Sequence, residues 1–361
     1  MRPVLQSNEA ISPSLKIVTR ILMNKGLPTF KSDSGPMTAL VAGAAGFVGT
    51  NFLQRVANQP GLRVIAVYRE KIPVVGGSNI RLVQADLRDP EQCRQLMRAV
   101  DQVFMFAGRL STAAVLRNHP VGPVTDNTVM NLNMLEAAYM AGVKSYVWLS
   151  SGTGYPARIT PCREDEFFDA DPPSPYEGVG WMSRYVEKIG ELYARRSKGR
   201  LTVASLRPTA MYGPYDDFEF ETCHALPALM RRVLEQHDPI EVWGSGKEER
   251  DYIFIDDVVD ACLLAAQGTS GSVALNIGSG QTFSLNELLE AMLTSESQRY
   301  VSIVHRGDVG LSVMKRAIDC TKAKEVLKFQ AKTSIKQGLR KTMAWRRSVM
   351  TSKKLQQVAQ V

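Results

Sequence analysis

Short apolar runs alternate with longer amphipathic stretches between residues 38 and 206. The short runs are typical of buried strands, and the amphipathic stretches are typical of helices. Alternation of the two indicates a parallel sheet with helices on both faces. We therefore expect an α/β fold with strands at 38–42, 63–68, 80–84, 102–106, 145–149 and 201–206, and helices at 46–58, 90–99, 127–141 and 185–196.

This pattern divides the chain into four predicted parts. Residues 37–206 form a Rossmann-type domain with a doubly wound parallel sheet, and residues 207–346 form mainly a smaller C-terminal substrate-binding subdomain, interleaved with the last sheet strands. Residues 1–36 precede the first strand, and they are interpreted as an appended helix, an organelle-targeting segment or the result of a start codon chosen too early. Residues 347–361 form a basic C-terminal tail.

A glycine-rich turn, Gly43-Ala-Ala-Gly46-Phe-Val-Gly49, joins the first predicted strand to the first predicted helix. Glycines here allow a tight turn, a close approach of the backbone to a ligand, and close packing of helix on strand. The amides at the start of the helix, including those of Phe47 and Val48, suit a pyrophosphate. Because the motif follows a strand and opens a helix within a βαβ unit, it predicts a dinucleotide-binding site.

The end of the second predicted strand bears on which dinucleotide binds. An acid there accepts a hydrogen bond from the ribose 2′-hydroxyl of NAD, whereas an arginine suits the 2′-phosphate of NADP. The sequence is Tyr68-Arg69-Glu70, with the tyrosine where the acid is expected. Arg69 therefore favours NADP, while the alternative leaves Arg69 on the surface and lets Glu70 bind the hydroxyl of NAD.

Charge and cysteine content narrow the function classes. The chain has 361 residues and a formal net charge of +8, but residues 331–361 carry eight Lys or Arg and no acid, and residues 1–36 carry a net +3. The central body is thus slightly acidic, and we do not expect nucleic-acid binding. The basic tail is interpreted as a solvated helix face, a contact with an anionic surface or a contact with nucleic acid. Five scattered cysteines without a C-x-x-C pair predict reduced thiols in a cytoplasmic protein and no metal site, and no apolar run is long enough to span a membrane.

Further motifs follow the glycine turn in a fixed order. They are 85–89 (Ala-Asp-Leu-Arg-Asp), 106–108 (Phe-Ala-Gly), 127–136, 149–151 (Leu-Ser-Ser), 206–208 (Leu-Arg-Pro) and 211–214 (Met-Tyr-Gly-Pro). With them, residues 38–346 resemble the extended short-chain dehydrogenases/reductases, and within these the NAD-dependent epimerases, dehydratases and reductases of nucleotide sugars. The resemblance implies that Asp86 and Leu87 border the adenine. It also implies that Ala107 and Gly108 border the ribose and pyrophosphate, with Asn127 as a further cofactor-binding residue.

The second half of the chain is most similar to GDP-fucose synthases. The similarity lies in residues 211–218, 223–232 and 242–246, followed by the run 250–257 (Arg-Asp-Tyr-Ile-Phe-Ile-Asp-Asp), which nucleotide-sugar enzymes share more widely. It implies that Arg250 binds the diphosphate of a nucleotide sugar, for which a guanidinium is chemically apt. The similarity also implies that Tyr212 belongs to the same substrate site. His224 matches a histidine that acts as acid and base in sugar epimerisation, although a lone histidine is more often structural.

The sequence departs from this family at the proton-transfer motif. The family uses a Ser or Thr together with Tyr-x-x-x-Lys on a helix, and its helices usually carry an acid four residues after the lysine. Anchoring on Glu187 places Val179 and Ser183 where the tyrosine and lysine belong. Shifting by one residue places Gly180 and Arg184 there, so neither register supplies the pair.

Three interpretations of this departure are open. Tyr176 reaches the site from an enlarged loop, with Arg184 as the cation at the cofactor; or His224 moves the protons; or the chain binds cofactor and ligand without turnover. The first two predict an NADP-dependent epimerase or keto-reductase in which Ser151 polarises the sugar oxygen. The third predicts a non-catalytic dinucleotide-binding protein.

Two predictions concern partners. A nucleotide sugar is the expected substrate, and RNA binding through the basic tail is a weaker alternative, because some atypical members of the resembled family bind RNA. By analogy with the family, we expect a homodimer in which the predicted helices 127–141 and 185–196 pair across a two-fold axis.

Overall fold

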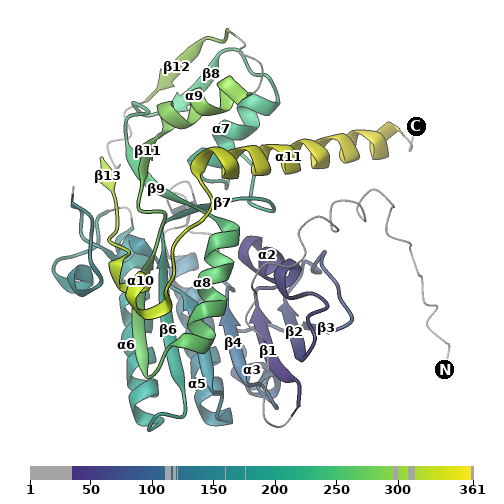
Figure 1. Ribbon diagram of the computed structural model, residues 1–361, viewed down its shortest axis with the longest axis vertical. Coiled ribbons are helices and arrows are strands. Elements are labelled where there is room, and N and C mark those ends of the chain that lie inside the picture. The colour runs from purple at the N-terminus through teal and green to yellow at the C-terminus, as the bar shows by residue number, and fades with distance from the viewer. Residues whose placement is uncertain are drawn as a thin grey trace.

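The computed structural model describes residues 35–109, 115–116, 119, 121–158, 160–174, 176–295, 300–307 and 314–358, with side chains up to residue 352. At its centre lies a seven-stranded sheet whose neighbouring strands are all parallel (Figure 1). All six predicted strands belong to it. The spatial order is β10 (Ser272–Ile277), β6 (Thr202–Pro208), β5 (Ser145–Leu149), β4 (Gln102–Met105), β1 (Met37–Ala42), β2 (Leu62–Tyr68) and β3 (Ile80–Gln84).

Helices cover both faces of this sheet. Successive residues of a strand point to opposite faces, so Val41 of β1 enters one hydrophobic core and Leu40 enters the other. The strand order reverses between β1 and β4, and such sheets bind ligands at this switch point. The predicted Rossmann-type α/β fold is therefore confirmed. One face carries α2 (Phe47–Val56) and α8 (Ile255–Gly268), and the other carries α3 (Pro90–Leu96), α5 (Gly122–Ala141) and α6 (Glu177–Arg196).

Two helices begin earlier than the sequence pattern predicted. The first turn of α5 contains Pro123, a residue suited to the first positions of a helix, so this helix begins at Gly122 rather than at 127. Helix α6 begins at Glu177 rather than at 185, because Gly178 and Gly180 do not interrupt it. Gly180 lies against Pro172 with no room for a side chain. The enlarged loop that the sequence analysis allowed before residue 185 therefore ends at Tyr176, and residues 177–184 are helical.

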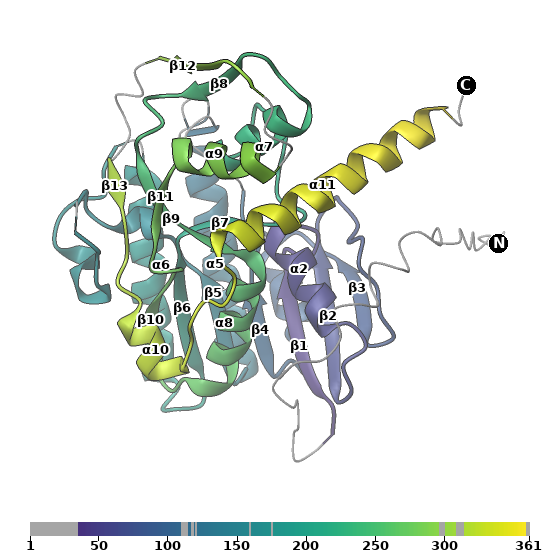
Figure 2. The same ribbon diagram turned by 45° about the horizontal axis from the view of Figure 1, so that its top comes forward.

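A second group of strands follows the carboxyl ends of the sheet (Figure 2). The strand β7 (Ala210–Tyr212) comes directly after β6 and pairs with β9 (Glu249–Phe254), which also pairs with β11 (Thr282–Ser284) and β13 (Lys315–Arg316). A separate pair joins β8 (Ile240–Trp243) to β12 (Ile303–Arg306). The helices of this part are α7 (Ala225–Leu234), α9 (Leu285–Ser295), α10 (Thr321–Leu327) and α11 (Ile335–Val358).

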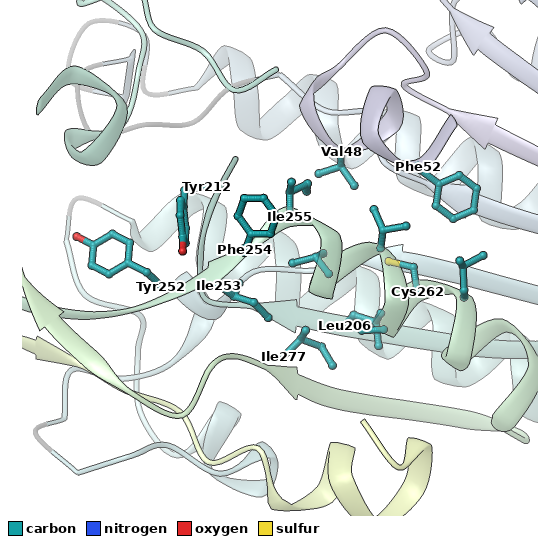
Figure 3. Close-up of a cluster of buried hydrophobic side chains, with 14 of the residues drawn as sticks. Val48, Phe52, Leu206, Tyr212, Tyr252, Ile253, Phe254, Ile255, Cys262 and Ile277 are labelled. Carbon is teal, nitrogen blue, oxygen red and sulfur yellow. The ribbon is translucent and has the colours of Figure 1, made fainter. Parts of the chain in front are cut away.

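One hydrophobic core connects this second group to the sheet. Figure 3 shows Leu206 of β6 and Ile277 of β10 near Ile253 of β9, while Phe254 lies toward Val48 of α2. Buried apolar contacts of this kind hold the two parts of the chain together. The second group is thus fixed beside the glycine turn that precedes α2.

The last helix, α11, begins inside this core and ends outside it. Leu339 and Met343 are buried, Gly338 lies against the Tyr212 ring, and the Trp345 ring lies 5.0 Å from that of Tyr215. Its second half projects past the rest of the fold in both ribbon views. One continuous helix therefore crosses the predicted boundary between residues 346 and 347, and the predicted extension 1–36 lies outside the described residues except for its last two.

Candidate functional site

The glycine turn has the geometry that the sequence predicted. Gly43 has a φ of +78°, and a Cβ there would lie 2.6 Å from the backbone nitrogen of Ala107. A Cβ on Gly49 would collide with the carbonyl oxygen of Gly43. Gly46 is the N-cap of α2 and offers no side-chain cap, so the first amides of the helix, at Phe47 and Val48, have no partner within it. These residues fit a pyrophosphate bound against bare backbone.

The ends of β2 and β3 lie side by side and carry the residues expected near an adenosine. Tyr68 pairs with Gln84 across the two strands. Arg69, which follows β2, forms an ion pair with Glu70 at 2.9 Å. Asp86 accepts hydrogen bonds from Arg88, which lower its pKa to about 2, and Arg69 acts in the same direction.

The loop after β4 is fixed beside the glycine turn. The backbone amide of Arg109 donates to the side-chain oxygen of Asn127 at 2.7 Å, and the Asn127 amide donates back to the carbonyl of Arg109. Asn127 is buried, so its role in the structure is to hold this loop. Ala107 touches Gly43, as the hypothetical Cβ contact shows, and Gly108 follows it. Leu87 is buried in the core below.

Ser151 stands at the end of β5, next to the start of α6. Its hydroxyl lies 2.8 Å from the hydroxyl of Thr153 and accepts a hydrogen bond from the Thr153 amide, and it caps the short helix η1 (Gly152–Gly154). The carbonyl of Thr153 faces Gly180 in the first turn of α6. Ser151 is partly exposed and therefore accessible to a ligand at the carboxyl end of the sheet.

The register anchored on Glu187 stays a prediction, and the structure shows how its three residues are held. Glu187 accepts hydrogen bonds from Ser150 at 2.5 Å and from Arg207 at 2.6 and 3.0 Å, in a buried ion pair. Val179 is 5% exposed and packs in the core. Ser183 donates its hydroxyl proton to the carbonyl of Val179.

Arg184 does not supply the cation that the sequence interpretation gave it. Its side chain is buried, and it donates to the carbonyl of Gly154 at 2.8 and 3.0 Å and to that of Ala170 at 2.5 Å. The guanidinium also stacks on Trp181, with its central carbon 4.7 Å from the ring centroid. The bonds to Gly154 and Ala170 tie the segment that contains these two residues to α6. We correct the prediction accordingly, because the side chain is buried and two of its three guanidinium nitrogens already donate to main-chain carbonyls.

Tyr176 immediately precedes α6, and the partner that it meets is a residue that the sequence did not single out. The guanidinium of Arg316 in β13 lies 5.0 Å from the centroid of the Tyr176 ring. Arg316 pairs in register with Arg250 of β9, so both arginines belong to neighbouring strands at the same height. A two-residue strand far along the chain gives no spacing signal, and only the three-dimensional pairing brings Arg316 to the site.

The remaining candidates lie in the second group of strands. Arg250 donates to the carbonyl of its neighbour Glu249 at 2.7 Å. His224 is the exposed N-cap residue of α7, and the surrounding protein lowers its pKa. No contact given by the structure joins His224 to Ser151 or Tyr176. Tyr212 is 1% exposed and packs against Phe254, so we correct its assignment from substrate contact to core residue.

No group of three or more His, Cys, Asp or Glu among the described residues is arranged to hold a metal ion. No described helix combines the length and apolar character required to cross a membrane. All five cysteines are free thiols.

Known proteins match this arrangement over most of the chain. The model of the NAD dependent epimerase/dehydratase family matches residues 39–278. GDP-mannose 3,5-epimerase 1 of Oryza sativa subsp. indica is 26% identical over 323 residues, which cover 88% of this chain and 84% of that protein. GDP-L-fucose synthase 1 of Arabidopsis thaliana is 28% identical over 317 residues, covering 80% and 91%.

Solved structures agree with these matches. UDP-glucose 4-epimerase of Thermotoga maritima with UDP-glucose superposes with a TM-score of 0.77 at 27% identity, over 87% of this chain and all of that one. MoeE5 in complex with UDP-glucose and NAD superposes with a TM-score of 0.76 at 27% identity, over 87% and 99%. The resemblance stated from the motifs is thereby confirmed, and the chain belongs to the NAD-dependent epimerase/dehydratase family.

Proposed function

We propose that this chain is an NADP-dependent enzyme that epimerises a nucleotide-activated hexose or reduces its keto group. The observation that carries the proposal is the glycine turn at the switch point of the sheet, where Gly43 and Gly49 leave no room for side chains. The amides that open α2 would hold the pyrophosphate of the dinucleotide, which supplies hydride transfer when bound. Arg250, from the second group of strands, would hold the diphosphate of the sugar nucleotide.

The choice of NADP over NAD rests on Arg69. Its side chain is half exposed at the end of β2, and its present partner Glu70 is even more exposed. A surface ion pair of this kind is worth little, so a 2′-phosphate can replace the carboxylate. We expect Arg69→Ala to weaken NADP binding at least about tenfold and to leave NAD binding unchanged, measured by calorimetric titration. Equal losses for both dinucleotides would assign the specificity elsewhere.

The sugar nucleotide is proposed to carry guanosine diphosphate. Support comes from the similarity to a GDP-mannose epimerase and a GDP-fucose synthase, while UDP-glucose is the ligand named for the similar solved structures. The test incubates purified chain with each dinucleotide and then with GDP- and UDP-hexoses, and follows the sugar by NMR. Uptake of neither dinucleotide would refute the whole proposal.

A non-catalytic binding protein is the second candidate, and α6 is the observation that favours it. In the register anchored on Glu187, Val179 and Ser183 would take the positions where the family has its phenol and its ammonium group. Val179 packs in the core and Ser183 donates to the Val179 carbonyl, so neither side chain would exchange a proton with a sugar. Loss of a general acid/base without a substitute costs about 10²–10⁴ in rate. Tight binding of dinucleotide and sugar nucleotide with unchanged sugar after long incubation would establish this alternative.

A homodimer in the cytoplasm completes the proposal. The outer faces of α5 and α6 carry exposed apolar side chains, Val129 and Met140 on the first helix and Trp181 and Tyr185 on the second. A soluble monomer gains by covering such side chains, and the two helices already pack on each other. Sedimentation of the chain and of a Met140→Glu variant tests this surface, with a shift toward monomer expected for the variant.

A further inference from the structure

One tyrosine at the edge of the candidate site, Tyr176, has a hydroxyl group that forms no hydrogen bond with any described residue. The hydroxyl of Tyr155 donates to Asn276 at 2.6 Å and accepts from Arg207 at 2.8 Å, so its hydrogen-bonding capacity is used inside the protein. Tyr146 is buried in the core. Tyr176, in contrast, is partly exposed, and its hydroxyl makes no hydrogen bond with any residue that the structure describes.

Tyr176 stands at the start of α6, one turn before the residue that faces the Ser151 segment. It precedes Val179 by three residues and Gly180 by four, and residues at these spacings share one face of a helix. The amide of Gly180 donates to the carbonyl of Tyr176 at 2.8 Å, which places the tyrosine one turn before Gly180. Gly180 itself faces the carbonyl of Thr153, two residues after Ser151.

The cation above Tyr176 is held without a counter-ion among the described residues. Arg316 forms no ion pair and no hydrogen bond there, and its contact is the Tyr176 ring at 5.0 Å. Burial lowers the pKa of Arg316. The titratable and charged groups near it on neighbouring elements are Tyr176, Arg250 and Cys162. An arginine remains charged even where burial disfavours it. Arg316 therefore places a permanent positive charge beside the ring of Tyr176, whose hydroxyl has no hydrogen-bond partner among the described residues.

We propose that Tyr176 and Arg316 together replace the tyrosine and lysine that α6 lacks. This inference rests on the proposed function. Tyr176 takes the proton of the sugar hydroxyl. The hydrogen on the same carbon leaves with its electron pair as hydride, which the oxidised dinucleotide would accept, and the carbon–oxygen bond becomes double. In the reductive direction Tyr176 returns the proton to the oxygen. Arg316 is a positioning residue whose guanidinium holds the Tyr176 ring in place before the proton is taken and after it is returned.

The first experiment removes the phenol hydroxyl. Tyr176→Phe is expected to lower turnover about 10²–10⁴-fold while the affinities for dinucleotide and nucleotide sugar stay unchanged. Tyr300→Phe is the matched control, because Tyr300 is an exposed tyrosine shortly before β12 and outside the proposed dimer surface, and it is expected to retain wild-type turnover. Wild-type turnover by the Tyr176→Phe variant would overturn the proposal, and a loss in His224→Gln instead would assign the proton transfer to the imidazole.

The second experiment separates a charge effect from a packing effect. Arg316→Met is expected to lower kcat while KM and the affinity for the dinucleotide stay unchanged, and Arg316→Lys, which keeps the positive charge, is expected to restore most of kcat. An unchanged kcat in Arg316→Met, or a loss that Arg316→Lys does not restore, would overturn the role of Arg316.

The third experiment distinguishes failure of this inference from failure of the proposed function. A Val179→Tyr/Ser183→Lys double variant rebuilds the family pair in the Tyr176→Phe background, and we expect it to recover turnover. If wild type binds both ligands without turnover and the rebuilt chain turns over, Tyr176 is not a proton-transfer group and the chain is naturally a binding protein. If neither chain takes up a dinucleotide, the proposed function itself is wrong. Thermal melts of each variant exclude unfolding as the cause.

Discussion

A negative charge at Gly46 offers the most direct test of the dinucleotide site. Gly46 is the N-cap of α2 with extended backbone, φ −80° and ψ 178°, and it makes no side-chain cap. A Cβ there meets only the carbonyl oxygen of Gly43, at 3.3 Å. Aspartate is among the preferred N-cap residues and exceeds glycine by a few tenths of a kcal/mol. The Gly46→Asp variant should therefore fold with undiminished stability.

The same carboxylate would lie beside the phosphates of a bound dinucleotide. Two unit charges about 5 Å apart repel by about 0.8 kcal/mol in water and by about 3 kcal/mol at an effective dielectric constant of about 20. The pyrophosphate carries more than one charge, and about 1.4 kcal/mol corresponds to a tenfold change in Kd. We therefore expect Gly46→Asp to weaken dinucleotide binding from about tenfold to a few hundredfold.

The measurement is a titration of dinucleotide into each folded variant at two salt concentrations. Gly46→Asn is the matched control, because asparagine caps a helix equally well and has nearly the same volume without the charge. The difference between Asp and Asn should shrink as salt screens the repulsion. Equal affinities for the Asp, Asn and wild-type chains at low salt would show that no phosphate rests at the start of α2.

Three further predictions concern stability. Glu187→Gln leaves Arg207 buried without its anion and should lower the free energy of unfolding by about 3–5 kcal/mol in urea, whereas an effect below about 1 kcal/mol would contradict the buried pair. Arg184→Lys should lower it by about 1.5–3 kcal/mol without changing dinucleotide affinity, and a selective loss of affinity would reinstate Arg184 at the cofactor. Because the pKa of His224 is lowered on folding, the folded chain binds fewer protons there, so stability is complete above the ordinary value of 6.5 and falls as the pH drops below it. Urea titrations across this range should show a shallower fall in His224→Gln, and an identical slope would contradict the shift.

The sequence was sufficient for six of the seven strands of the parallel sheet and for the glycine turn, because these are encoded locally. Apolar runs of strand length specify β1 to β6, and the turn between Gly43 and Gly49 requires glycine for steric reasons that act within a few residues. The starts of α5 and α6 could not be placed in the same way. Gly178 and Gly180 weaken the helical pattern locally, and the contact of Gly180 with Pro172 that favours a bare backbone comes from the tertiary structure.

The candidate site was predictable only where its residues follow strands of the sheet. Ser151 and Arg69 lie where the pattern placed them, at the ends of β5 and β2. Arg184 was misassigned because a sequence shows that a side chain is charged but not where it points. The carbonyl groups to which it donates belong to a part of the chain that precedes α6. Arg316 escaped notice because its position depends on the pairing of β13 with β9, which joins segments more than sixty residues apart.

The pairing of Glu187 with Arg207 and Ser150 shows that one sequence motif can contain a residue needed for folding beside positions used for chemistry. The glutamate is needed for folding, because its removal leaves a buried guanidinium without its anion, whereas the family resemblance places the reactive pair four and eight positions before it. A substitution at those two positions can therefore leave this ion pair and the fold that it supports intact. A motif search that requires the tyrosine and lysine will miss proteins that lack this pair. A search that requires the glutamate will find them and group them with the family.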